Sequence, residues 1–145
     1  MIIGLGIDLV EVARLEEALN RHGERFAERI LSVNEYPSFM ALPTGQQARF
    51  LAKRFAVKEA FSKAAGTGIG RGFGFHDVWL IHDALGKPQL QWSARVDSVL
   101  DLQAVHSHVS VTDLGDGMEE IEVRLPDPAG GAPSFYRIQV LMTAP

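Results

Sequence analysis

The sequence contains no cysteine. Disulfide bonds, zinc sites built from thiolates and a cysteine nucleophile are therefore excluded. It also lacks an apolar run long enough to cross a bilayer, and no basic segment precedes the first acidic residue, Asp8, so we expect neither a membrane-spanning helix nor a signal peptide. These absences favour a cytoplasmic protein with no membrane partner.

Charge of one sign is not in large excess. With 14 basic and 18 acidic residues, the formal net charge is −4 and the isoelectric point lies near 5.7, so we expect no broad binding of nucleic acid. One short stretch is nevertheless rich in basic residues that could hold an acidic ligand or partner: Lys53, Arg54, Lys58, Lys63 and Arg71.

The length and composition are those of one ordinary domain. Of the 145 residues, 46% are hydrophobic and 22% charged, which is enough to build a core and too apolar for a disordered chain. No internal repeat and no linker divides the chain, so we predict a single domain over residues 1–145.

The pattern of apolar residues predicts an α+β fold, with helices packed on an antiparallel sheet. Strands are expected over residues 2–7, 75–82, 89–92, 106–113, 119–125 and 135–142, with 75–82 and 89–92 paired as a hairpin. Helices are expected over about 10–22, over 26–31, after a capping-box pattern at 32–35, between 44 and 66, and after Ser93. Trp79 and Trp92 are expected in the core, and His76 and His82 on the surface.

The helix expected between residues 44 and 66 carries charge where it should be buried. A capping-box pattern of Thr44 and Gln47 begins it, and Gly66 ends it. Alanine and phenylalanine occupy most of its circumference; Glu59 falls among them, with Lys63 one turn further on. A carboxylate held there needs a cation, and a metal ion is one candidate. The alternative is a plain surface ion pair between Glu59 and Lys63.

Asp8 is a second carboxylate of interest. It is predicted at the end of the first strand, in which Gly6 indicates the close approach of another backbone or a ligand. Together with Glu59 it would make a plausible Mg²⁺ site, because this ion usually takes one or two protein carboxylates and completes its shell with water and substrate oxygens. The alternative role of Asp8 is to cap the next helix.

Glycine occupies every second position from Gly66 to Gly74. Such a loop can present backbone N–H groups to phosphate oxygens, although it matches neither the Walker A pattern nor a dinucleotide-binding fingerprint. A mobile surface loop is the alternative. Several other polar residues have ordinary structural roles when they are considered singly: Arg14, Arg21, Lys87 and His108.

Several segments occur together in an order and spacing that resemble a known family. In chain order they are G-I-D at 6–8 with L-V-E-V-A-R-L-E after it, R-F-L-A-K-R-F-A-V-K-E-A at 49–60, K-A-A-G-T-G-I at 63–69, L-G-K-P at 85–88 and H-V-S-V-T-D at 108–113. They resemble the holo-[acyl-carrier-protein] synthases, the small type of 4′-phosphopantetheinyl transferase. The resemblance covers about residues 2–113 and the final strand.

The resemblance implies a reaction in which coenzyme A gives its phosphopantetheine arm to a serine of apo acyl carrier protein, in fatty acid biosynthesis, and adenosine 3′,5′-bisphosphate leaves. It implies that Asp8 and Glu59 bind Mg²⁺ and that Lys63 binds the diphosphate. The coenzyme A site would include Arg54, Gly66, Thr67, Gly68, Gly86, Lys87, Pro88 and His108. Arg14 and Arg21 would face the acidic carrier protein, and the family implies a homotrimer with sites between subunits.

Three points stay open at the level of sequence. The base that accepts the serine proton could be Glu59, Asp8 or His108. The rival functions are a coenzyme A diphosphate hydrolase using the same metal, and a binding subunit without turnover. The family usually passes by a short turn from the H-V-S-x-T segment to the last strand, whereas here residues 114–134 intervene, which we interpret as a lengthened hairpin.

Overall fold

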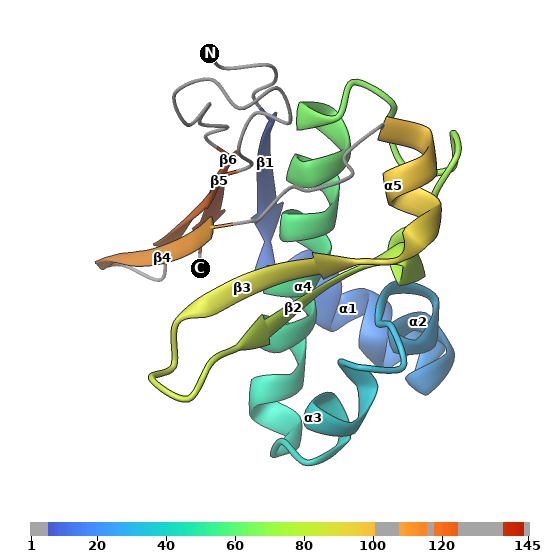
Figure 1. Ribbon diagram of the computed structural model, residues 1–145. Helices are drawn as coiled ribbons and strands as arrows, with labels where there is room; N and C mark the ends of the chain where they lie inside the picture. Colours follow the sequence, from blue (N-terminus) through green and yellow to red (C-terminus); the bar gives the residue numbers. More distant parts are fainter. Residues whose placement is uncertain (1–5, 101–107, 116–117, 125–137, 144–145) are drawn as a thin grey trace.

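The computed structural model describes residues 6–100, 108–115, 118–124 and 138–143 (Figure 1). The helices are α1 (Val12–His22), α2 (Glu24–Ile30), α3 (Tyr36–Met40), α4 (Thr44–Ala64) and α5 (Ala94–Leu100), with a short 3-10 turn η1 (Phe75–Asp77). The strands are β1 (Gly6–Glu11), β2 (Val78–His82), β3 (Pro88–Trp92), β4 (His108–Gly115), β5 (Met118–Arg124) and β6 (Ile138–Thr143). No helix in this part of the chain is both long and apolar enough to span a membrane.

Helix α4 is the central element of the fold. It crosses the molecule with β1 alongside it and the β2–β3 hairpin across it, while α1, α2 and α3 gather around its lower half (Figure 1). Its alanines allow this crowding, because they bring neighbouring backbones close; Ala52, Ala56 and Ala60 are fully buried. The core around them contains Phe39, Phe61 and other apolar side chains from α1, α2, β2 and β3.

The strands form three pairs. The β2–β3 and β4–β5 pairs are antiparallel hairpins, as the sequence predicts. The β1–β6 pair is parallel, with Gly6 opposite Ile138 and Asp8 opposite Val140, so this part of the expected antiparallel arrangement is wrong. The predicted α+β class is confirmed.

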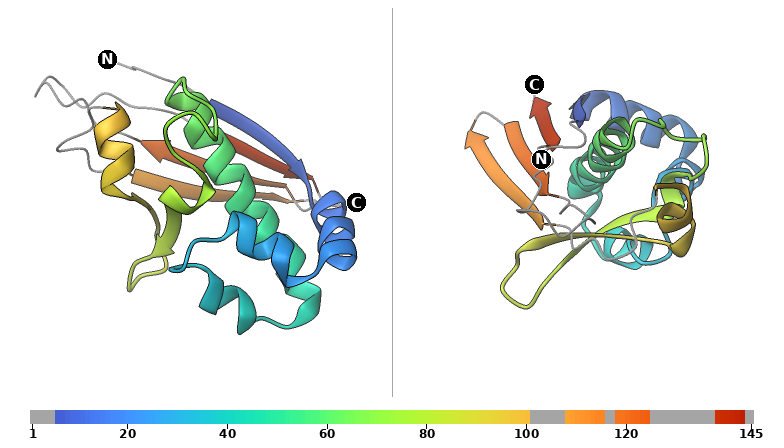
Figure 2. Two further views of the ribbon diagram at one scale, coloured as in Figure 1. Left: turned by 90° about the vertical axis from the view of Figure 1, so that its right-hand side faces the viewer. Right: turned by 45° about the horizontal axis from the view of Figure 1, so that its top comes forward.

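Glycine at position 6 allows β1 to lie directly on α4, and Figure 2 shows the two side by side. A Cβ atom built on Gly6 would lie 1.9 Å from the carbonyl oxygen of Ala60 and 2.6 Å from the amide nitrogen of Ala64. Both atoms belong to the helix backbone, which cannot move aside as a side chain can. The predicted close approach at Gly6 is therefore confirmed, and it fixes how near Asp8 comes to the helix.

Replacing Gly6 with alanine should destabilise the protein by about 3 kcal/mol, because overpacking a tight contact costs up to that amount. For a chain of this size this corresponds to a melting temperature lower by roughly 10 °C. Gly45→Ala is the matched control, since a Cβ there meets nothing within 4 Å and alanine favours helix. Thermal unfolding that leaves Gly6→Ala as stable as Gly45→Ala would contradict the packing described here.

Several local predictions are corrected by the structure. Asp8 lies within β1 rather than at its end and caps no helix, because α1 begins four residues later and its N-cap residue is Glu11. Thr44 and Gln47 form no capping box; the amide of Gln47 instead donates to the carbonyl oxygens of Phe39 and Leu42. Residues 75–77 form η1 before the strand starts at Val78.

Both tryptophans are half-buried. Trp92 packs against the core beside Phe61, as predicted, and its indole N–H donates to Asp97, whereas Trp79 donates to Gln91 at the surface of the hairpin. His76 and His82 are exposed, as expected.

Candidate active site

The site is organised around Asp8, whose carboxylate is mostly buried between β1 and α4. Only 13% of its side-chain surface is exposed, and its Oδ1 atom accepts a hydrogen bond of 2.7 Å from the ammonium group of Lys63. Its other oxygen, Oδ2, is buried and accepts no hydrogen bond from the described residues. A buried carboxylate oxygen without a donor is unfavourable unless another cation or donor occupies the space beside it.

Glu59 faces the same space from α4. Burial raises the pKa of the Glu59 carboxyl, the nearby charge of Asp8 raises it further, and Lys63 acts in the opposite direction. The three charged groups therefore carry one more negative charge than positive charge in a half-buried place. Lys63 bonds to Asp8 and its charge also acts on Glu59, so it interacts with both carboxylates rather than with Glu59 alone.

These residues fit a magnesium ion. The unpartnered Oδ2 of Asp8 and the crowded carboxylate of Glu59 are the hard oxygen donors that Mg²⁺ prefers. Among the described residues, no group of three or more histidine, aspartate or glutamate side chains is placed to hold a metal. Two carboxylates suit Mg²⁺, which keeps several ligand positions for water and substrate.

Asp8 and Glu59 line a groove of about 430 Å³ together with Arg14. Its floor is apolar and comes from α1, α2 and α4, through Leu15, Ala18, Phe26 and Phe55. Arg14 is exposed, and Arg21, two turns further along α1, is also exposed and bonded to Glu17 at 3.0 Å. The structure thus brings Arg14 to the carboxylates and leaves Arg21 on the surface beyond them.

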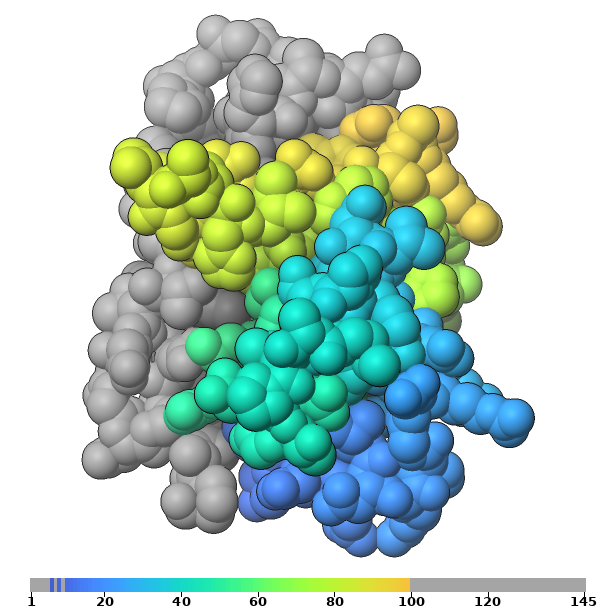
Figure 3. Space-filling view, turned by 90° about the horizontal axis from the view of Figure 1, so that it is seen from below, coloured from blue at the N-terminus to red at the C-terminus, as the bar shows by residue number. Residues whose placement is uncertain are grey.

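A second, basic groove of about 680 Å³ lies where the β2–β3 hairpin meets α3 and the first turns of α4 (Figure 3). Helix α4 contributes Arg49, Phe50, Lys53 and Arg54, and the hairpin contributes His82, Gly86 and Pro88. The predicted coenzyme A residues Arg54, Gly86 and Pro88 are therefore neighbours, although they are far apart in the sequence. Lys87 stands exposed in the same hairpin turn.

The turn from Gly66 to Gly68 ends α4, as predicted. Both glycines have positive φ angles, 73° and 71°, which explains why glycine is needed there. The N–H group of Gly66 donates to Lys63, and those of Thr67 and Gly68 donate to Ser62, so these groups close the helix and are not open to a phosphate. The hydroxyl of Thr67 is buried and has no hydrogen-bond partner among the described residues, so it is the polar group of this turn that a ligand could use.

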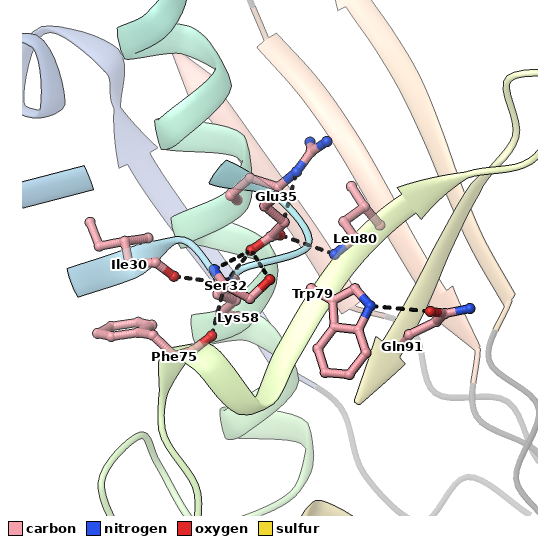
Figure 4. Close-up of polar contacts among 9 residues, drawn as sticks. Ile30, Ser32, Glu35, Lys58, Phe75, Trp79, Leu80 and Gln91 are labelled. Carbon is pink, nitrogen blue, oxygen red and sulfur yellow. Dashed lines mark hydrogen bonds and ion pairs between the residues drawn. The ribbon is translucent and has the colours of Figure 1, made fainter. Parts of the chain in front are cut away.

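The sequence analysis missed a buried charge cluster made of Glu35 and Lys58 (Figure 4). Glu35 is only 2% exposed, Lys58 is fully buried, and their charged atoms lie 2.6 Å apart. The ammonium group of Lys58 also donates to the carbonyl oxygens of Ile30 and Phe75, so each of its three N–H groups has an acceptor. Burial lowers the pKa of Lys58, and Glu35 opposes that effect.

Glu35 holds three parts of the fold together. Its carboxylate accepts hydrogen bonds from the backbone and the hydroxyl of Ser32 and from the N–H of Leu80 in β2. The predicted capping box at Ser32–Glu35 thus has the expected contact from Glu35 back to Ser32, but no side chain caps α3. Lys58 is structural, which corrects the expectation that it helps to hold an acidic ligand. A lysine among the buried alanines and phenylalanines of α4 was the available signal.

His108 is the first residue of β4 and pairs with Arg124 of β5. The predicted hairpin after the H-V-S-x-T segment is confirmed over β4 and β5, which carry the acidic residues Glu119, Glu120 and Glu122. Residues 116–117, which include Asp116, and residues 125–134 of the intervening segment lie outside the described residues.

The comparisons with known proteins agree with this geometry. Residues 4–127 match the family model described as the 4′-phosphopantetheinyl transferase superfamily. A holo-[acyl-carrier-protein] synthase of Vibrio cholerae is 52% identical over 114 residues, covering 78% of this chain and 89% of the relative. The corresponding protein of Azoarcus is 48% identical over 116 residues, covering 80% and 91%.

Solved structures are similar as well. The holo-[acyl-carrier-protein] synthase of Neisseria meningitidis aligns with a TM-score of 0.69 at 38% identity, over 78% of this chain and 90% of that one. The enzyme of Bacillus anthracis in complex with CoA (3′,5′-ADP) aligns with a TM-score of 0.63 at 39% identity, over 78% and 87%. The predicted family and enzyme class are confirmed: the chain belongs to the 4′-phosphopantetheinyl transferase superfamily.

Proposed function

We propose that this chain transfers the 4′-phosphopantetheine group of coenzyme A to a serine of apo acyl carrier protein, giving the holo carrier protein and adenosine 3′,5′-bisphosphate. The observation that carries the proposal is the groove in which Asp8, Glu59 and Arg14 meet. It combines a place for a metal and a diphosphate with a cation for an acidic partner. Relatives named holo-[acyl-carrier-protein] synthase support it, and so does the coenzyme A complex of a similar structure.

In the proposed reaction the serine hydroxyl oxygen forms a bond to the β-phosphorus of coenzyme A. The bond from that phosphorus to the oxygen of adenosine 3′,5′-bisphosphate breaks, and the serine proton passes to a base. Mg²⁺ held by Asp8 and Glu59 would neutralise the charge on the diphosphate. The nucleophile belongs to the partner protein, so this chain needs no reactive serine of its own.

The side chains of the chain supply positioning and charge. Lys63 already lies at the edge of the site, bonded to Asp8, and its ammonium group can bind a diphosphate oxygen there. Glu59, which faces the same space as Asp8 and Lys63, is the group we favour to accept the serine proton, directly or through a water. Asp8 and His108 remain the other candidates.

Coenzyme A carries three phosphate groups, and the chain offers two places for them. The carboxylate site with Lys63 suits the diphosphate, and the basic groove with Arg54, Gly86, Lys87 and Pro88 suits a further phosphate. Thr67, in its turn between Gly66 and Gly68, adds a hydroxyl without a described partner. Arg14 and Arg21, both exposed on α1, would bind the carrier protein.

We propose that the protein acts in the cytoplasm, in fatty acid biosynthesis.

We also propose that it forms a homotrimer. Arg54 and Glu59 are five residues apart on α4 and so point about 140° away from each other. A second copy of the chain would complete a site whose parts face different sides of one helix. Light scattering should give three times the chain mass of 15.9 kDa, and a mass of one chain would contradict the trimer.

Intact-mass spectrometry tests the reaction. Apo acyl carrier protein is incubated with the chain and coenzyme A, with Mg²⁺ or with a chelator. We expect the carrier to gain the mass of one phosphopantetheine only when metal is present. No gain with several carrier proteins, together with free adenosine bisphosphate, would favour a diphosphate hydrolase; no gain and no product would favour a binding subunit.

A further inference from the structure

The basic groove has an unusual charge distribution. Three basic residues that line it, Arg49, Lys53 and Arg54, come from α4, and His82 stands at the end of β2 on the opposite wall. No aspartate or glutamate is found among the described residues that line it. The groove therefore offers several cationic groups to a ligand and no competing carboxylate.

Arg54 is fixed in this groove. It is only 6% exposed, its guanidinium lies 4.2 Å from the centre of the Phe50 ring, and its Nε atom is 3.5 Å from Glu35. Glu35 is nearer to Lys58, at 2.6 Å, so one buried anion faces two cations. The positive charge of Arg54 is thus only partly balanced within the protein, and its field reaches the groove.

The positive charges of the groove act on His82. His82 is exposed on one side only, so partial burial lowers the pKa of its imidazole, and the charges of Arg54 and Lys53 lower it further. Asp83, beside it in the hairpin turn, acts in the opposite direction, but its carboxylate also accepts the N–H groups of Leu85 and Lys87. The imidazole of the free protein is therefore protonated less readily than that of an ordinary histidine, although it stands in a groove suited to anions.

We propose that His82 is a phosphate-binding residue of the basic groove and becomes protonated when a phosphate group of the substrate enters. This inference rests on the proposed function, because it takes coenzyme A and adenosine 3′,5′-bisphosphate as the ligands. The imidazolium would donate an N–H to a phosphate oxygen from the hairpin wall, opposite Arg54. The hairpin then contributes a charge-assisted hydrogen bond that the free protein lacks.

The direction of the pH effect follows from charge. A phosphate adds negative charge beside His82, which favours the imidazolium and raises the pKa of His82 in the complex. In the pH range between the pKa of His82 in the free protein and its pKa in the complex, ligand binding is accompanied by proton uptake at His82. His82 therefore strengthens ligand affinity as the pH falls through that range. The phosphate group binds best in its fully ionised form, so its own ionisation weakens affinity as the pH falls. The difference between variants isolates the part due to His82.

Titration calorimetry with adenosine 3′,5′-bisphosphate tests the inference. The full chain, in the oligomeric state in which it purifies, is titrated at pH 7 in buffers of different ionisation enthalpy, which gives the number of protons taken up. Wild type should take up more protons than His82→Asn, and His82→Asn should bind roughly tenfold more weakly, as expected for the loss of one charge-assisted contact. His82→Arg should keep the affinity and lose the extra uptake, because its charge is permanent.

His22→Asn is the matched control, since His22 is exposed at the end of α1 and does not line the groove; it should behave as wild type. Equal proton uptake by wild type and His82→Asn would overturn the inference, whether or not the affinity changes. If wild type binds the nucleotide and transfers phosphopantetheine while proton uptake is equal, only this inference fails. If wild type does not bind the nucleotide, the proposed function fails with it.

Discussion

Glu59→Gln is expected to reduce phosphopantetheine transfer on the order of a thousandfold, because it removes the charge of the proposed metal ligand and the proposed base at once. The shape of the side chain is kept, so the loss would come from charge and proton affinity. The rate is measured by following the mass of the carrier protein with saturating coenzyme A. Glu28→Gln, an exposed position on α2 away from the groove, should keep full activity.

The same substitution should stabilise the metal-free protein near neutral pH. The raised pKa of Glu59 means that the folded chain binds more protons than the unfolded chain between the ordinary glutamate value of 4.5 and the raised value. The contribution of Glu59 to stability is therefore present below that range and is lost as the pH rises through it. Glutamine removes this loss, so the unfolding midpoint of the mutant should be higher at pH 7 and the two curves should converge in acid.

Added Mg²⁺ should raise the melting temperature of wild type and leave Glu59→Gln nearly unchanged, because a ligand stabilises only the state that binds it. Unchanged transfer together with an unchanged response to Mg²⁺ in the mutant would refute the role of Glu59 as a ligand. If wild type and the mutant both bind coenzyme A and neither transfers phosphopantetheine, the result would favour a binding subunit without turnover.

Glu35→Gln should cost about 3–5 kcal/mol, because it leaves Lys58 charged and buried without its partner. Both oxygens of Glu35 face donors, Leu80 on one side and Ser32 and Lys58 on the other, so the amide group of glutamine meets an N–H or O–H whichever way it turns. Chemical denaturation should show this as a lower midpoint with a similar slope.

Two further variants separate charge burial from general damage. Glu17→Gln removes the carboxylate of an exposed pair with Arg21 and should change stability little. Combining Glu35→Gln with Lys58→Met should cost less than the sum of the two single changes, because the second change removes the charge that the first leaves unpaired. Strict additivity would contradict direct coupling between the two residues.

Much of the site was visible in the sequence because it depends on local patterns. The alanines of α4 and the glycines after it predict a buried helix with a sharp end, and Glu59 and Lys63 take their places from its periodicity. The glycine at position 6 predicted the close contact between β1 and α4 that brings Asp8 to that helix.

What could not be predicted depends on partners distant in the sequence. Glu35 looks like an ordinary capping residue until Lys58, Leu80 and Arg54 gather around it from α4 and β2. The parallel pairing of β1 with β6 is likewise invisible in either strand alone, because both have the composition of any half-buried strand. The basic groove could not be predicted either, because His82 and Arg54 become neighbours only when the β2–β3 hairpin packs over α4.

The pairing of β1 with β6 has a consequence for the order in which the protein acquires activity. Gly6 pairs with Ile138. The strand that carries Asp8 is therefore synthesised long before β6, the strand with which it pairs. Contacts of such high sequence separation form late and slowly. The segment from α2 to β3, joined by Glu35 and Lys58, can assemble on the ribosome well before that. Nascent chains stalled before β6 should therefore resist protease over that segment and show no transfer, so that catalysis begins only once synthesis has passed β6.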